Sequence, residues 1–161
     1  MSESQSGYFI SPAQQKVINR ALSLIEKKFM AAEEGPAICS PSSFIEYLRL
    51  KLWDHSREHF MVLFLNSQNK LIAAETLFSG GLSHVEVHPR VIARQALLCN
   101  AAAVIIAHNH PGGKALPSEP DKHITDKIRQ ALDLLDIRTL DHFILTSGSD
   151  YYSFAEHGLL L

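Results

Sequence analysis

Two histidines, His108 and His110, stand one residue apart at the end of the apolar run 101–107. The run is rich in β-branched residues and too short for a typical helix, so we predict that its second half forms a buried strand. Side chains alternate between the two faces of a strand, and both histidines therefore point the same way. Two neighbouring imidazoles at a strand end can hold one metal ion.

A third ligand is available in Asp121, at the start of a predicted helix. Ser118 has the type and position of an N-cap, Pro120 lies in the first turn, and Asp121 follows the cap by three residues. The loop 111–117 would fold this helix start back onto the two histidines. Two histidines and one carboxylate on Zn²⁺ leave a fourth position for water, which is the layout of a catalytic site.

Simpler interpretations exist for the same residues. The two histidines could make ordinary hydrogen bonds at a loop mouth, and Asp121 could belong to a Ser-x-x-Asp capping box with Ser118. Capping and metal binding are compatible, because one carboxylate oxygen could cap the helix while the other reaches a metal ion. The combined spacing of the four residues favours the metal site.

The spacing His-x-His-Pro, followed by Ser118 and Asp121, resembles the JAMM (MPN+) metalloprotease motif. The segment from about Glu58 to Leu161 is similar to the RadC-like branch of that family. The matching pieces are 107–111, Pro117-Ser118 with Asp121, Asp141-His142 and 154–158. The chain departs from the branch at three positions outside the predicted ligands, namely Val91, Gly112 and Lys114.

The resemblance implies a fold, a reaction and a partner. The fold is a single α/β domain with a mixed β-sheet flanked by helices, JAMM/MPN-like, with the layering of cytidine deaminases. The reaction is zinc-dependent hydrolysis of a peptide or isopeptide bond in a protein or peptide substrate. The implied ligands are His108, His110 and Asp121, and Zn²⁺ is the implied cofactor.

Glu58 lies just before the apolar run 60–65, where the resemblance implies a general base that takes a proton from the zinc-bound water. A surface glutamate paired with Arg57 is the simpler interpretation, and Glu75 on the next predicted strand is a competing base. We favour Glu58 because its place before the strand matches the family. By the same resemblance Ser118 donates a hydrogen bond to the developing oxyanion or to the metal-bound water, although one hydroxyl cannot easily do this and cap a helix.

Residues 55–59 read His-Ser-Arg-Glu-His, the His-x-x-Glu-His pattern of another class of zinc enzymes. That pattern needs both histidines on one helical turn, whereas the predicted strand begins at Phe60 and no third ligand is evident. We interpret the match as coincidence. A zinc deaminase needs a Pro-Cys-x-x-Cys pair, and the cysteines at 39 and 99 are too far apart to supply it.

The overall composition is that of a globular protein without a nucleic-acid footprint. The chain has 161 residues, 46% hydrophobic and 20% charged, with a net charge of -2. A sequence pI of about 6.5 reflects no excess of Lys and Arg, so DNA binding should be weak or absent. No run is long enough to span a membrane, and the polar residues 1–7 lack a signal-peptide core. Because the cysteines form no Cys-x-x-Cys pair, we expect a cytoplasmic protein with reduced thiols.

The pattern of apolar and turn residues predicts an N-terminal helical extension over 1–39. The resemblance implies that 40–161 form a RadC-like JAMM/MPN metallohydrolase domain. Helices are predicted at 11–32, 40–55, 89–101 and 118–135, and strands at 60–65, 71–78, 83–87, the second half of 101–107, 140–146 and 151–154. The first helix could present a dimer or partner surface, but packing on the domain is the favoured interpretation. His142 is expected to be a buried, hydrogen-bonded histidine.

Two functions without efficient hydrolysis remain open at this point. One is a non-enzymatic or weakly active factor in DNA repair or metabolism, as the RadC name suggests, and a basic stripe facing solvent would favour it. The other is a binding module that holds an extended peptide tail by strand addition beside the site. The sequence identifies neither the substrate nor the oligomeric state.

Overall fold

The structure, a computed structural model, describes residues 10–29, 41–80 and 86–160. Within these ranges the chain forms four helices and five strands. The helices are α1 (Pro12–Phe29), α2 (Pro41–Lys51), α3 (Pro89–Leu98) and α4 (Glu119–Asp133). The strands are β1 (His59–Leu65), β2 (Leu71–Ser79), β3 (Ala103–Asn109), β4 (Arg138–Leu145) and β5 (Tyr151–Ser153).

The five strands make one mixed sheet in the order β2-β1-β3-β4-β5. β1 pairs antiparallel with both β2 and β3, and β4 pairs antiparallel with β5. β3 and β4 are parallel. Parallel neighbours need a crossover connection, which α4 supplies. The predicted single α/β domain with a mixed sheet is thus confirmed.

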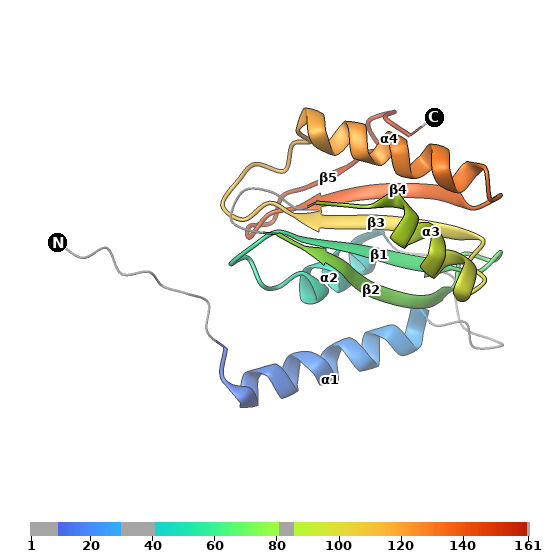
Figure 1. The fold of residues 1–161 in the computed structure, drawn as a ribbon. Helices are drawn as coiled ribbons and strands as arrows, with labels where there is room; N and C mark the ends of the chain where they lie inside the picture. The colour runs from blue at the N-terminus through green and yellow to red at the C-terminus, as the bar shows by residue number, and fades with distance from the viewer. Residues whose placement is uncertain (1–9, 30–40, 81–85, 161) are drawn as a thin grey trace.

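Helices cover both faces of this sheet, as the ribbon in Figure 1 shows. The β1 side chains that pack with α2 are Met61, Leu63 and Leu65, and those that pack with α3 and α4 are Phe60, Val62 and Phe64. This alternation follows from the two-residue period of a strand. β3 alternates likewise, with Val104 and Ile106 on the side of α3 and α4. His108 continues that row, so it faces the start of α4.

α1 packs against the outside of α2. Leu22 and Ile25 contact the apolar cluster that α2 forms with the sheet. Glu26 accepts a hydrogen bond from the Tyr47 hydroxyl at 3.0 Å and pairs with Lys51 at 2.6 Å. These contacts fit the expectation that the first helix packs on the domain. The proposed boundary at 39/40 lies outside the described residues and stays a prediction.

Several predicted element ends need correction. α3 ends at Leu98 rather than near residue 101, because Asn100 adopts a left-handed backbone with φ 54° and closes the helix. α2 ends at Lys51 rather than near residue 55, because the chain turns there and the Asp54 carboxylate accepts a hydrogen bond from the Ser56 amide. α4 ends at Asp133, slightly earlier than predicted.

The predicted strand 83–87 falls mostly on residues 81–85, which lie outside the described ranges, and residues 86–88 form no strand. Across the described part of the chain, no helix has the length and apolar character needed to cross a bilayer.

Candidate metal centre

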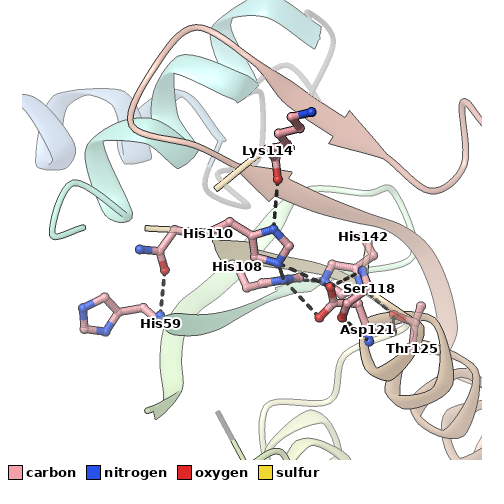
Figure 2. A network of polar contacts seen from close by, with 9 residues as sticks. His59, His108, His110, Lys114, Ser118, Asp121, Thr125 and His142 are labelled. Atoms are coloured by element: carbon pink, nitrogen blue, oxygen red, sulfur yellow. Dashed lines mark hydrogen bonds and ion pairs between the residues drawn. The ribbon is translucent and has the colours of Figure 1, made fainter. Parts of the chain in front are cut away.

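The carboxyl end of β3 and the start of α4 meet at one point of the sheet. His108 is the sixth residue of β3 and pairs in register with Phe60 of β1 and Ile144 of β4, which keeps it in the middle of the sheet. His110 follows the strand end, and its amide donates to the Leu145 carbonyl at 2.8 Å. Both imidazoles therefore project from the same strand end toward α4 (Figure 2).

The first turn of α4 presents Asp121 to these rings. Ser118 is the N-cap: its hydroxyl oxygen accepts from the Asp121 amide at 3.2 Å, and the Asp121 carboxylate accepts from the Ser118 amide at 2.7 Å. This is the predicted capping box, and Pro120 lies in the first turn as expected. The two bonds fix the backbone and the side chain of Asp121 together, so the carboxylate is held in place before any ligand binds.

The three side chains converge. The Nε2 atoms of His108 and His110 lie 2.9 Å apart. Asp121 Oδ1 is 3.3 Å from Nε2 of His108, and Oδ2 is 3.3 Å from Nε2 of His110. One nitrogen or oxygen from each residue lies within 4.8 Å of the others, and among the described residues this is the one such group of three or more potential ligands.

The proton positions on the two imidazole rings indicate that His108, His110 and Asp121 can bind a cation. The His110 Nδ1 lies 3.1 Å from the Lys114 carbonyl, which can only accept, so this nitrogen carries the proton and a neutral ring has its lone pair on Nε2. On the His108 ring, Nδ1 lies 2.7 Å from Nε2 of His142. Two Nε2 lone pairs 2.9 Å apart repel each other unless a proton or a metal ion lies between them. Two imidazole nitrogens and a carboxylate are a donor set that zinc accepts.

The charges of the centre agree with that arrangement. Burial acts to raise the pKa of Asp121, but its close contacts with the His108 and His110 rings outweigh burial and hold this pKa well below its usual range. The hydrogen bond to Asp121 raises the pKa of His110 above 6.5 in spite of burial. Without a metal ion, the centre therefore holds a carboxylate and favours a protonated His110. A divalent cation would take the place of that proton.

A cavity of about 580 Å³ opens onto the centre. Its polar wall includes the three converging residues together with Glu58 and Ser118. Its apolar wall is made by Phe60, Val87, Pro111, Pro120 and Ile124. The predicted base and the predicted oxyanion donor thus share one cavity with the predicted ligands. Their catalytic roles stay predictions.

Comparison with known proteins adds the family. Residues 38–159 match the RadC-like JAB domain. The chain belongs to this family. UPF0758 protein YfjY of Escherichia coli strain K12 is 51% identical over 146 residues, which cover 91% of this chain and 89% of that protein. UPF0758 protein YeeS of the same strain is 47% identical over 151 residues, covering 94% of this chain and 100% of that protein.

In this RadC-like JAB domain, the pieces Asp141-His142 and 154–158 lie directly behind the metal centre. His142 is fully buried on β4 and contacts His108. Phe154 stacks on the His142 ring with centroids 4.6 Å apart. The expectation of a buried, hydrogen-bonded His142 is confirmed, but its partner could not be read from the sequence because the two rings lie 34 positions apart.

Asn109, between the two histidines, is a residue that the sequence reasoning missed. Its side chain is completely buried on the opposite face of the strand. It accepts from the His59 amide at 2.7 Å and donates to the carbonyls of Asp54 and Arg57 at 3.2 and 2.9 Å. These bonds hold the backbone on both sides of Glu58. One strand end therefore positions both the ligand pair and the proposed base.

The competing base Glu75 and the two histidines of the His-x-x-Glu-His pattern do not line this cavity. Glu75 accepts a hydrogen bond from Gln95 at 3.1 Å and is absent from the described cavity wall. The His-x-x-Glu-His residues occupy a turn and the start of β1, not a helix. The His59 ring is engaged by Ser79 at 2.8 Å and Asp54 at 3.1 Å. These positions leave Glu58 as the one carboxylate of the two candidates that faces the centre.

Proposed function

We propose that this protein is a zinc-dependent hydrolase that cleaves a peptide or isopeptide bond. One observation carries the proposal: His108, His110 and Asp121 converge in a cavity that also contains a separate carboxylate, Glu58. A metal ion held by three protein ligands, with a separate carboxylate in the same cavity, is an arrangement that can hydrolyse an amide bond with water. The membership of the RadC-like JAB domain family supports this reading.

The metal ion and Glu58 have separate roles in the proposed reaction. When bound, a zinc ion supplies Lewis-acid chemistry, polarising the substrate carbonyl and lowering the pKa of water to about 7. Glu58 accepts the proton of the attacking water and delivers it to the leaving nitrogen. Glu58 can do this because it lies in the cavity without belonging to the converging ligand group.

In the proposed reaction Ser118, which lines the cavity, stabilises charge on the substrate oxygen. Its oxygen accepts the Asp121 amide proton in the capping box, yet a hydroxyl that accepts one bond still has its own proton to donate. Capping and oxyanion stabilisation are therefore compatible in this geometry. A donor of this kind contributes ~2.7–4 kcal/mol in the transition state.

The size and lining of the cavity support a peptide substrate. A cavity of about 580 Å³ with both apolar and polar lining residues has room for a peptide segment. The proposed substrate is therefore a protein or peptide, with the scissile amide over the centre.

A panel of peptide and isopeptide substrates incubated with zinc-loaded protein tests the proposal. We expect time-dependent cleavage by the wild type, and none after zinc removal or in Asp121→Asn. Re-addition of zinc should restore cleavage to the wild type alone. Peptide binding without turnover in the zinc-loaded wild type would replace the hydrolase with the peptide-binding alternative.

A further inference from the structure

We propose that His142 and Thr125 are positioning residues that fix the tautomer of His108, so that its Nε2 lone pair is directed at the metal position. The inference rests on the metal site of the proposed function and does not depend on hydrolysis. Figure 2 shows the rings and the hydroxyl as one connected chain of contacts behind the site.

The chain of hydrogen bonds starts at the Thr125 hydroxyl. Its oxygen lies 2.6 Å from the main-chain carbonyl of Asp121 and 2.6 Å from Nδ1 of His142. A carbonyl can only accept, so the single hydroxyl proton is donated to Asp121. The contact with His142 then requires that Nδ1 of His142 donates to the Thr125 oxygen.

The second link follows from the first. His142 is fully buried between aromatic rings, and its two nitrogens contact a hydroxyl and an imidazole, so the ring is neutral and carries one proton. With that proton on Nδ1, the Nε2 of His142 is an acceptor. It lies 2.7 Å from Nδ1 of His108, which must therefore donate. A neutral His108 then has its lone pair on Nε2, the atom that faces Asp121.

The surroundings hold the His142 ring in the orientation that this chain needs. Phe154 stacks on it at 4.6 Å, and Phe60 meets its edge at 5.7 Å. Asp141 anchors the Phe154 segment by accepting from the Ser153 hydroxyl at 2.6 Å and the Ala155 amide at 3.0 Å. The segments 141–142 and 153–155 thus serve one purpose, which is to keep a neutral imidazole behind His108.

The chain of bonds begins and ends on the same residue. Its first acceptor is the main-chain carbonyl of Asp121, and its last lone pair faces the Asp121 carboxylate. The first turn of α4 therefore places the third ligand and sets the proton position on the first ligand together. Outer partners of this kind typically change metal affinity by about 10- to 100-fold when removed.

Thr125 offers a matched pair of variants. Thr125→Val keeps the shape but removes the acceptor for His142 Nδ1, so His142 and His108 become free to exchange tautomers. Thr125→Ser keeps the hydroxyl. We expect the affinity for zinc alone, measured by competition with a chelator, to fall about 10- to 100-fold in Thr125→Val and by less than about threefold in Thr125→Ser.

Nitrogen NMR of the metal-free protein at pH 8 supplies a readout that a merely structural role would not change. His108 should show a protonated Nδ1 and an unprotonated Nε2 in the wild type and in Thr125→Ser, and a mixture in Thr125→Val. His142→Phe, which keeps an aromatic ring against Phe154, should lower zinc affinity as Thr125→Val does. Should one of these variants fail to fold, the other still decides the point.

Two results would overturn the inference. One is a wild-type His108 protonated on Nε2, and the other is a Thr125→Val protein with wild-type tautomer and zinc affinity. Failure of the hydrolase proposal has a different signature, namely normal zinc binding and tautomers in the wild type without cleavage of any substrate.

Discussion

The segments 55–59 and 108–121 each contain two histidines and at least one carboxylate, but their backbones differ. In the second segment a strand end and a capped helix start direct three side chains to one point. In the first, a turn runs into β1, and the three side chains separate. His55 lines a different cavity, Glu58 faces the metal centre, and the His59 ring bonds to Asp54 and Ser79. Backbone geometry, rather than residue type, decides which histidines can share an ion.

The comparison also shows that the two segments cooperate. Asn109 lies between the histidines of the second segment and bonds to the backbone of the first. Of the first segment, only Glu58 then enters the cavity of the second. In the proposed function the first segment supplies the base and the second supplies the metal ligands, so variants of the two segments can separate metal binding from proton transfer.

The largest effect is expected from Glu58→Gln, which keeps size and polarity but cannot accept a proton. Hydrolysis of a cleaved substrate should fall by roughly 10²–10⁴-fold, the usual contribution of a positioned base. Zinc content and melting temperature should stay near those of the wild type. Steady-state rates, elemental analysis and thermal melts measure the three quantities.

Glu75→Gln is the matched control, since Glu75 lies on β2, next to the strand that follows Glu58, but is not among the residues that line the cavity. It should change neither rate nor zinc content. If Glu75→Gln is inactive while Glu58→Gln is fully active, the general base is Glu75 and not Glu58. Unchanged rates in both would remove carboxylate-assisted proton transfer from the mechanism.

The next effect concerns pH and zinc. The raised pKa of His110 means that the proton stabilises the metal-free centre below pH 6.5, and that this contribution is lost as pH rises through the raised pKa. Asp121 stays ionised throughout, because its pKa is depressed. Zinc must displace the proton of His110 when it binds. The stabilisation of the folded protein by zinc should therefore be small near pH 5.5 and grow toward pH 8.

Thermal melts with and without zinc across this pH range measure that effect. Zinc at 100 times its dissociation constant should add about 2.7 kcal/mol at the alkaline end. Magnesium, which prefers oxygen ligands, controls for general ionic effects. A zinc shift that stays constant from pH 5.5 to 8 would contradict a centre built on two histidines.

A smaller effect is expected from Asn109→Ala, which tests whether Asn109 links the segments 55–59 and 108–121. The variant leaves the His59 amide and the carbonyls of Asp54 and Arg57 without their partner, at a cost of about 1–3 kcal/mol in unfolding free energy. Because Glu58 loses its support while the ligands do not, the rate should fall more than the zinc content.

Denaturant unfolding, rate and zinc measurements on Asn109→Ala test this link. Asn19→Ala, on the exposed surface of α1, is the control and should stay within about 0.5 kcal/mol of the wild type. Loss of zinc with an unchanged rate per bound ion would show that Asn109 supports the ligands instead of Glu58.

The smallest effect is expected with nucleic acid. With a net charge of -2, the chain should bind duplex DNA at physiological salt no more tightly than the ~10⁻⁴–10⁻⁶ M of non-specific contact. A fluorescence anisotropy titration measures this. Nanomolar affinity at that salt concentration would put the DNA-metabolism alternative ahead of the hydrolase.

Local signals made much of this arrangement predictable from the sequence. Alternation along an apolar strand placed His108 and His110 on one face, and the Ser118 cap placed Asp121 at a helix start. Both rules act over a few residues. The continuous apolar runs likewise predicted β1 and β3, because strands in the middle of a sheet are buried on both faces.

What escaped prediction depends on contacts between distant parts of the chain. Thr125, His142 and His108 meet only because α4 crosses over from β3 to β4, and the sequence spacings of 17 and 34 carry no periodic signal. Asn109 meets its partners at separations of 50 or more. The early end of α3, by contrast, could have been predicted from a local signal. Asparagine tolerates the left-handed backbone found at Asn100.

Metal content of three histidine and aspartate variants tests the central claim most directly. Elemental analysis should find about one zinc per chain in the wild type and in His55→Ala, and none in His108→Ala or Asp121→Ala. Full zinc in both of the latter variants would contradict the assignment of the centre. Loss of zinc in His55→Ala with retention in the other two would move the metal site to the segment 55–59.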